Sequence, residues 1–141
     1  MPDNPLVFVM DAAGAYDAAV ADAVARPIGG LAGAFTPAFV TSGAFERLFN
    51  GDSRVLGAEE QFSRVPDWLL GKSQATYSAQ DDVMNGWRRV ELTLHLRRYR
   101  LSKGRQSSVV PLTVTGAGYS DASALAVACE RISRQIQERL R

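Results

Sequence analysis

Residues 107–141 constrain the fold most, because two different periodicities meet there across a short glycine segment. Val110, Leu112 and Val114 alternate with proline and threonine, which is typical of a strand with one buried face. Further on, apolar side chains recur every three or four positions, as they do along one side of a helix. These side chains are Leu125, Cys129, Ile132, Ile136 and Leu140. The pattern predicts a strand followed by a long amphipathic helix.

The join between this strand and this helix contains turn and capping residues. Gly116-Ala117-Gly118 interrupts the alternation, so we expect the strand to end there in a tight turn. Ser120 can cap the helix, since its hydroxyl can accept a hydrogen bond from a backbone N–H of the first turn. Asp121 in the first turn and Arg139 in the last turn both suit the helix dipole. The helix is therefore predicted to begin near residue 120.

Two further alternating stretches precede this unit. Residues 68–78 and residues 90–97 each place apolar or small side chains at every second position. The loop between them ends in Asn85-Gly86, a favoured hairpin dipeptide, and residues 102–105 are expected to form the next hairpin. Such short connections force antiparallel neighbours, so the sequence predicts a three-stranded antiparallel meander.

The pattern of the middle strand changes at its end. Tyr99 and Leu101 fall on odd positions, whereas the apolar residues before them fall on even positions. This slip predicts a β-bulge near Arg97-Arg98 or a frayed strand end. Pro111 in the last strand indicates an edge position, because proline donates no hydrogen bond to a sheet.

The amino-terminal part predicts a strand and then a helix. Residues 6–10 form a continuous apolar run, as expected of a strand that is covered on both faces. An alanine-rich segment follows at residues 15–26, in which Tyr16, Val20 and Val24 share one helix face. The opening of the chain therefore predicts a strand and a helix, with a second strand to follow.

The stretch between this helix and the meander is less regular. Pro27 prevents the helix from continuing, and residues 34–40 predict a second strand. Pro37 within it indicates an edge strand or an irregular one. Thr41 or Ser42 can cap a short helix that ends at Gly51. The apolar side of this helix is Phe45, Leu48 and Phe49, and a further short helix is expected around residues 58–63.

The resulting element order is β-α-β-α-(α)-β-β-β-α, which makes the chain an α+β protein of the mixed α/β kind. We expect a single domain over residues 1–141, in which helices pack on a mixed sheet that contains the antiparallel meander. A chain of 141 residues is long enough to bury a substantial core. The glycine-rich segment 29–35 is interpreted as a connector rather than as a ligand loop.

Composition narrows the classes of function. Hydrophobic residues at 46% and charged residues at 22% are typical of globular chains, and a net charge of +1 gives no general attraction to nucleic acid or anionic membranes. The chain has no apolar run of about 20 residues, so no transmembrane segment is expected. The start, Met-Pro-Asp-Asn-Pro, does not resemble a signal peptide. Cys129, the only cysteine, is predicted to be a small buried apolar residue.

The sequence offers few catalytic groups. His95 is the only histidine, which excludes a two-histidine metal site, and it is predicted on the polar face of its strand near Glu91. Asp81 and Asp82 lie in a turn and supply too few oxygen ligands for a metal ion. We therefore expect no catalytic residue, no metal site and no cofactor, and we expect that the chain is not an enzyme.

The segment from Gly116 to Asp121 is a candidate nucleotide-binding loop, because it is rich in glycine and joins a strand to a helix. It matches the first two glycines of a dinucleotide-binding fingerprint, but Asp121 stands where the third glycine should be. A carboxylate at that place would repel a pyrophosphate. We interpret these glycines instead as residues of a tight turn and of close packing.

Basic side chains gather between residues 88 and 105. They are Arg88, Arg89, Arg97, Arg98, Arg100, Lys103 and Arg105. Our first interpretation is a solvated edge or a surface for a protein partner, comprising Arg88, Arg97, Arg98, Arg100, Arg105 and His95. A basic two-stranded ribbon can also neutralise phosphates, so the alternative is a nucleic-acid-binding module built on residues 88–105.

Three segments of the carboxy-terminal half carry a resemblance to known families. Trp68-Leu69-Leu70-Gly71 is similar to the strand that opens the second half of the curli secretion channel and penicillin-binding-protein activator group. The hairpin from Tyr99 to Arg105 resembles the strand and glycine turn of that group. Gly116-Ala117-Gly118-Tyr119-Ser120, with the alanines at 122, 124, 126 and 128, resembles its closing turn and helix. The same pattern resembles the TolB amino-terminal domain and the flagellar assembly protein T.

This resemblance covers residues 68–141 and implies a small α/β domain of the kind found in bacterial envelope proteins, some of them lipoproteins. Such domains bind partners or self-assemble, and they offer no catalytic residues to carry over. The chain lacks the long apolar hairpins of a secretion pore and a lipid-bearing amino-terminal cysteine. The resemblance therefore implies a non-catalytic, periplasmic or envelope-associated binding or assembly module that acts through protein–protein contacts or self-association.

Overall fold

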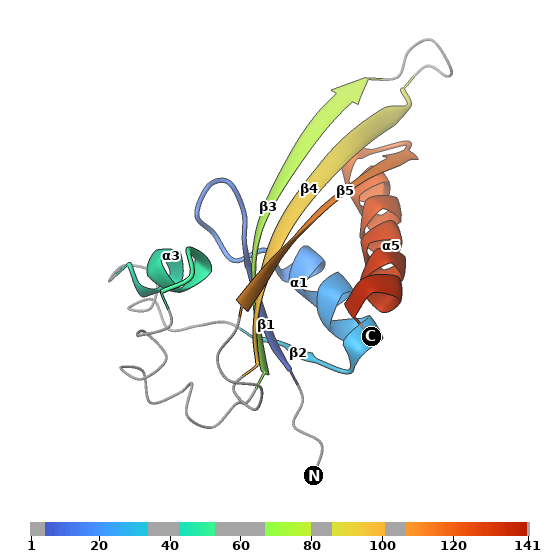
Figure 1. Ribbon diagram of the computed structural model, residues 1–141. Helices are drawn as coiled ribbons and strands as arrows, with labels where there is room; N and C mark the ends of the chain where they lie inside the picture. The colour runs from blue at the N-terminus through green and yellow to red at the C-terminus, as the bar shows by residue number, and fades with distance from the viewer. Residues whose placement is uncertain (1–4, 34–42, 53–66, 80–85, 101–106, 141) are drawn as a thin grey trace.

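The computed structural model describes residues 5–33, 43–52, 67–79, 86–100 and 107–140 (Figure 1). Of Arg100, Ser107, Ser108 and Leu140 it describes the backbone alone.

The strands form a five-stranded mixed sheet in the order β2-β1-β3-β4-β5. Their bounds are β1 Leu6–Met10, β2 Leu31–Ala32, β3 Asp67–Ala79, β4 Arg88–Arg100 and β5 Ser107–Gly118. β1 pairs in parallel with both β2 and β3, whereas β3, β4 and β5 form an antiparallel meander. The predicted fold class and the predicted meander are confirmed.

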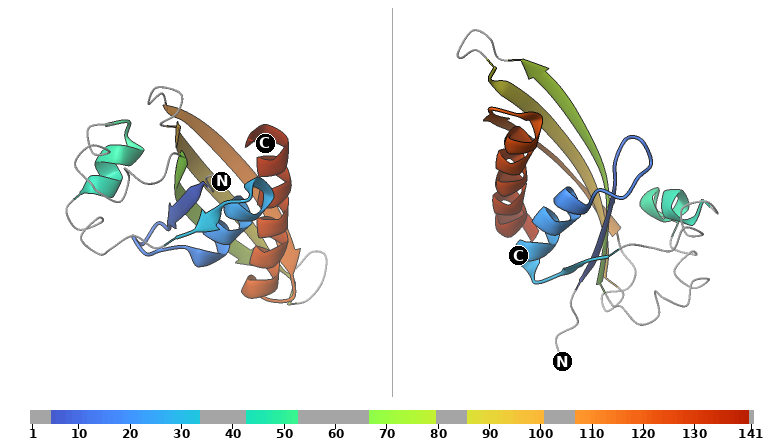
Figure 2. Two further views of the ribbon diagram at one scale, coloured as in Figure 1. Left: turned by 90° about the horizontal axis from the view of Figure 1, so that it is seen from below. Right: turned by 180° about the vertical axis from the view of Figure 1, so that it is seen from behind.

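The helices divide between the two faces of the sheet (Figures 1 and 2). α1 (Ala18–Ala25), the 3₁₀ turn η1 (Arg26–Ile28) and α5 (Asp121–Leu140) lie over one face, which we call the helix side. The short helix α3 (Ala44–Phe49) lies over the opposite face, which we call the far face. Because α3 is short, it covers only one end of the far face.

The main core lies on the helix side. There, every second side chain of the strands packs against apolar side chains that recur every three or four residues along the helices. α5 contributes Ala124, Ala128, Ile132 and Ile136, all fully buried. The strands and α1 contribute Val7, Val9, Val20, Val24, Leu69, Val90, Leu92, Leu94, Leu96, Leu112 and Val114. The alternating faces are therefore confirmed, and so are Cys129, Ile132 and Ile136 of the predicted helix stripe. Leu125 is only partly buried, because the buried face of α5 also includes Ala124 and Ala128, and the side chain of Leu140 is not described.

A second, smaller core lies on the far face beneath α3. It consists of Phe8, Met10, Ala44, Phe45, Leu48, Trp68, Leu70 and Tyr99. β1 is thus covered on both faces, as predicted. The expected bulge near Arg97-Arg98 is wrong, because β3 and β4 pair without interruption through Trp68↔Tyr99. Tyr99 faces α3, and its hydroxyl donates to the carbonyl of Leu48 at 2.5 Å.

The first helix is shorter than the predicted span of residues 15–26. Tyr16 precedes it and forms an isolated β-bridge with Met10. Asp17 then caps α1, since its carboxylate accepts from the backbone N–H of Val20 at 3.2 Å. The same carboxylate accepts from the hydroxyl of Ser73, a buried side chain of β3, at 2.6 Å. This bond ties the start of α1 to the sheet.

Among the described residues, the second strand is β2, which has only two residues. The glycine-rich segment 29–35, predicted to be a connector, thus contains a short strand. The predicted strand 34–40, the capping residues Thr41 and Ser42, the helix 58–63 and the hairpin 102–105 lie outside the described residues. α3 itself follows Gly43 and has no side-chain cap among the described residues.

The glycines of Gly116-Ala117-Gly118 do not form the predicted tight turn, because β5 continues through Gly118. They are required by the close approach of α5, so the predicted close packing is confirmed and the predicted turn is wrong. A Cβ on Gly116 would lie 2.7 Å from the backbone nitrogen of Ala128 and closer still to the carbonyl oxygen of Ala124. Ser120 caps α5 as predicted, and its hydroxyl accepts from the N–H of Ser123 at 3.1 Å.

β5 is an edge strand, and α5 covers part of that edge. Arg131 donates from Nη1 to the carbonyl of Thr115 at 2.7 Å, and Arg139 donates to the carbonyl of Pro111 at 3.4 Å. Pro111 itself has no N–H to offer. Because open edges invite pairing with other strands, these contacts restrict the extension of the sheet at β5.

Candidate functional site

The predicted basic surface is divided between the two faces of the sheet. Arg88 and Arg98 stand at even positions of β4, and the even positions of this strand face the helix side. Arg88 pairs with Asp121 at 2.7 Å, and Arg98 makes a two-pronged contact with Asp67 at 2.7 and 3.1 Å. The side chains of Arg98 and Asp67 are only 13% and 16% exposed, so this pair is largely internal.

The other members of that predicted surface lie elsewhere. Arg97 projects to the far face and donates to the backbone carbonyl of Phe49. His95 is exposed on the same face, as predicted. Arg100 ends β4 with its side chain undescribed, and Arg105 lies outside the described residues. The described arginines therefore do not gather on one surface, which does not favour the phosphate-binding ribbon.

A hollow of about 370 Å³ opens on the far face, beyond the carboxyl end of β1. We call it the β1 hollow. Its walls are Met10, Asp11, Ala12, Gly14, Glu46, Lys72, Ser73, Gln74, Thr93 and His95. It brings His95 near two carboxylates, Asp11 and Glu46, that are distant from it in sequence.

Existing interactions use part of this polar lining. Lys72 pairs with Glu46 at 2.6 Å and lies 4.9 Å from the centre of the Phe49 ring. Asp11 accepts with Oδ1 from the backbone N–H groups of Ala13 and Ala15, both at 2.9 Å. This turn fixes the orientation of the Asp11 carboxylate at the mouth of the hollow.

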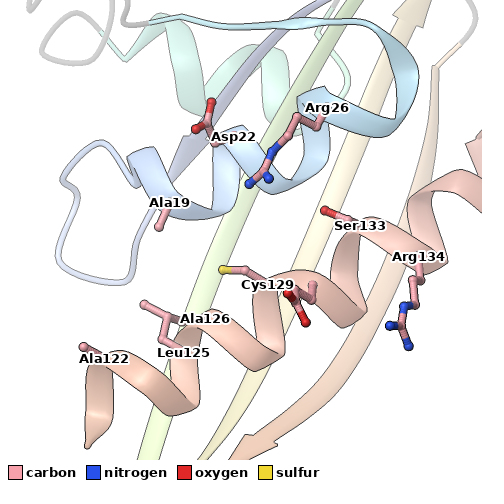
Figure 3. A pocket seen from close by; sticks show the side chains of 10 residues that line it. Ala19, Asp22, Arg26, Ala122, Leu125, Ala126, Cys129, Ser133 and Arg134 are labelled. Carbon is pink, nitrogen blue, oxygen red and sulfur yellow. The ribbon is translucent and has the colours of Figure 1, made fainter.

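A second depression, of about 730 Å³, lies between α1 and α5 (Figure 3). We call it the α1–α5 groove. It is lined by Ala19, Asp22, Arg26, Ala122, Leu125, Ala126, Cys129, Glu130, Ser133 and Arg134. At one end the hydroxyl of Ser133 donates to the carbonyl of Ala23 at 2.6 Å and holds the two helices together.

The surface of the α1–α5 groove combines small and charged residues. Ala19, Ala122 and Ala126 are exposed, so the helix backbones are accessible there. Figure 3 shows the side chain of Arg26 extending toward α5 and Cys129 on the side of α5 that faces α1. Cys129 is buried as predicted, and this burial, followed by the nearby charge of Asp17, raises the pKa of its thiol above the ordinary value of 9.0.

Two further findings concern the part of the chain that the structure describes. Within residues 5–33, 43–52, 67–79, 86–100 and 107–140, no three histidine, cysteine, aspartate or glutamate side chains are grouped so as to hold a metal ion. None of the helices that the structure describes is long and apolar enough to cross a membrane. Asp81 and Asp82 lie outside the described residues.

Comparisons with known proteins show a similarity of fold and nothing further. No protein-family profile and no curated protein matches the chain. The hypothetical protein CT253 from Chlamydia trachomatis is similar in structure, with a TM-score of 0.58 and 10% identity over 99% of this chain and 96% of that one. A "putative lipoprotein" from Caulobacter crescentus CB15 matches with a TM-score of 0.35 and 11% identity, over 95% and 86% of the two chains. The chain thus shares its fold with CT253.

Sequence reasoning missed both depressions. The α1–α5 groove has a signal in the exposed alanines of both helices, because small residues on a helix surface permit close approach of another element. The β1 hollow has a signal in Asp11, a polar residue directly after a buried parallel strand. Neither signal indicates which distant residues complete the depression.

Proposed function

We propose that the chain is a non-catalytic binding or assembly module of the bacterial envelope, and that it acts through contacts with another protein. The observation that carries this proposal is the α1–α5 groove. The envelope assignment is supported by the resemblance of residues 68–71 and 116–128 to envelope domains. The partly covered β5 edge favours a side-chain surface over sheet extension as the means of contact.

The occupant that fits the groove is an amphipathic helix of a partner protein. The exposed alanines at 19, 122 and 126 leave space for the side chains of such a helix, and Leu125 offers it an apolar contact. Asp22 and Glu130 line the groove with negative charges, and Arg26 and Arg134 line it with positive ones. None of these four side chains has an ion pair with another described residue. An apolar stripe flanked by charges of both signs would complement this lining.

The test begins with a photoreactive amino acid placed at Ala19, at Ala126, or at the control position Ala79 on the exposed end of β3. In bacterial envelope extract we expect one and the same protein to be cross-linked from Ala19 and Ala126, but not from Ala79. A partner cross-linked equally from Ala79, or no cross-linked protein at all, would contradict the proposal.

A quantitative arm follows with the purified partner. Ala126→Arg places a long charged side chain in the groove and should weaken binding about tenfold or more, whereas Ala79→Arg should not change it. Melting curves check that both variants fold. Turnover of an ester, phosphate or glycoside substrate that is lost in His95→Ala would overturn the non-catalytic assignment.

A further inference from the structure

The β1 hollow lies where the chain connections of the sheet diverge. From β1 the chain passes through α1 on the helix side to β2, whereas β3, on the other side of β1, leads away to β4. In sheets with parallel strands, a crevice at the carboxyl ends of two such neighbours is the usual position of a ligand. β1 ends at Met10, opposite Lys72, and β3 continues beyond it. The open space is therefore beside residues 72–74.

The strand register brings the polar residues of the hollow together. Lys72 pairs with His95, and Gln74 pairs with Thr93, all on the far face. The Cβ atoms of directly paired residues lie about 5 Å apart. Successive rows on one face are separated by about 7 Å, since each residue advances a strand by 3.2–3.4 Å. A molecule the size of an amino acid can thus contact both rows at once, and Asp11 lines the same hollow.

The free polar groups of the hollow are mainly hydrogen-bond acceptors. Asp11 uses only Oδ1 in its turn, and its Oδ2 has no hydrogen bond to a described residue. Gln74, Thr93 and His95 likewise make none within the described part of the chain, and each can accept one. The permanent donor, Lys72, is already paired with Glu46. Asp11 and Glu46 supply two carboxylates to the lining, and Lys72 supplies one ammonium group.

We propose that the β1 hollow binds a small organic cation, a primary amine or guanidine of about amino-acid size. The cationic group contacts Oδ2 of Asp11 and donates to Gln74 and Thr93, because these groups supply the unpaired acceptors. A volume of about 370 Å³ is near the lower limit for small-molecule sites, which suits a ligand of this size. This inference is independent of the α1–α5 groove.

The experiment titrates the isotopically labelled protein with agmatine at low salt and follows its backbone amide resonances. We expect saturable shifts that concentrate at Asp11, Gln74 and Thr93. 1,4-Butanediol, which is uncharged, should cause none, and calcium chloride should not compete. Shifts spread evenly over the protein, no saturable binding in the millimolar range, or competition by calcium would overturn the proposal.

Two isosteric variants separate the hollow from general electrostatics. Asp11→Asn removes the charge but retains the oxygen that accepts from Ala13 and Ala15, so the fold should persist. It should weaken agmatine binding about tenfold or more. Glu91→Gln removes an exposed charge on the same strand as Thr93, outside the hollow, and should change binding by less than about twofold. Equal losses in both variants would refute the assignment. Gln74→Ala, at an exposed position, provides a second test if Asp11→Asn is unstable.

Discussion

Gly116→Ala tests the close approach of α5 to β5. An added methyl group would meet backbone atoms of α5, at 2.7 Å from the nitrogen of Ala128 and closer to the oxygen of Ala124. Neither atom is at the end of a flexible side chain, so relief requires that the helix itself move away. The movement needed is on the order of 1 Å, and a gap of that size removes a quarter to a half of the dispersion energy of the affected contacts.

The affected contacts are those of the buried helix residues Ala124, Ala128 and Ile132 with the sheet. Overpacking typically costs about 1–3 kcal/mol, and together with the lost contacts we expect a loss of about 2–4 kcal/mol. This is a large fraction of a typical stability of about 5–15 kcal/mol. For a urea slope of about 2 kcal/mol per molar, in the middle of the usual range, the midpoint of unfolding should fall by about 1–2 M.

The sign of the stability change in Gly116→Ala shows whether packing against α5 or the intrinsic strand propensity of alanine dominates. In a strand without such a neighbour, replacing glycine by alanine stabilises by about 0.5–1 kcal/mol, because the unfolded chain loses freedom. Ala117→Val is the matched control, since it adds methyl groups to the adjacent residue of β5 on the opposite face. It should change stability by less than about 0.5 kcal/mol. A Gly116→Ala variant as stable as the wild type would refute the packing argument.

Three further predictions concern single side chains. Tyr99→Phe removes the hydroxyl that donates to the buried carbonyl of Leu48, which still accepts from the backbone N–H of Gly51 at 3.1 Å, and it should cost about 0.5–1.5 kcal/mol in urea unfolding. Ser120→Ala removes the cap from the N–H of Ser123 and should cost about 1 kcal/mol, with faster amide exchange in the first turn of α5. Because burial raises the pKa of the Cys129 thiol, iodoacetamide should react slowly in native buffer at pH 8 and rapidly in urea. The same raised pKa contributes stability below pH 9 that should decline as the pH rises above this value.

Each of these predictions has a contrary outcome. Unchanged urea midpoints for Tyr99→Phe would show that the hydroxyl adds no stability beyond the hydrogen bond from Gly51 to the same carbonyl. Uniform amide exchange along α5 in Ser120→Ala would show that the cap does not hold its first turn. Native alkylation of Cys129 as fast as in urea would show that the thiol is accessible, and Cys129→Ala should remove its part of the alkaline decline.

Local periodicity predicts the parts of this fold that depend on neighbours in sequence. The meander is predictable because its apolar side chains alternate, and α5 is predictable because its apolar side chains recur every three or four residues. Both patterns are clear because these faces pack against one continuous core. The error at Tyr99 has the same origin. Its odd position predicts a register slip, but the register is regular and α3 buries the far face at that end. Only tertiary packing reveals that second core.

The glycines before α5 show another limit of sequence reasoning. Glycine permits both a turn and a close approach, and the residue type does not distinguish them. At Gly116 the distances to Ala124 and Ala128 decide for close approach. The β1 hollow is less predictable still, because Asp11 and His95 meet only through the pairing of β1 with β3 and of β3 with β4. Two strand registers must be known before these residues can be placed together.

The arginine contacts from α5 to the edge of β5 have a consequence for synthesis. The residues that shield the edge, Arg131 and Arg139, are translated after the strand that they shield. A nascent chain that has completed the meander therefore presents unshielded carbonyl groups to other chains until the helix has emerged and docked. Stalled or truncated products should therefore aggregate more readily than the finished protein. Chaperones should bind the nascent chain during that interval.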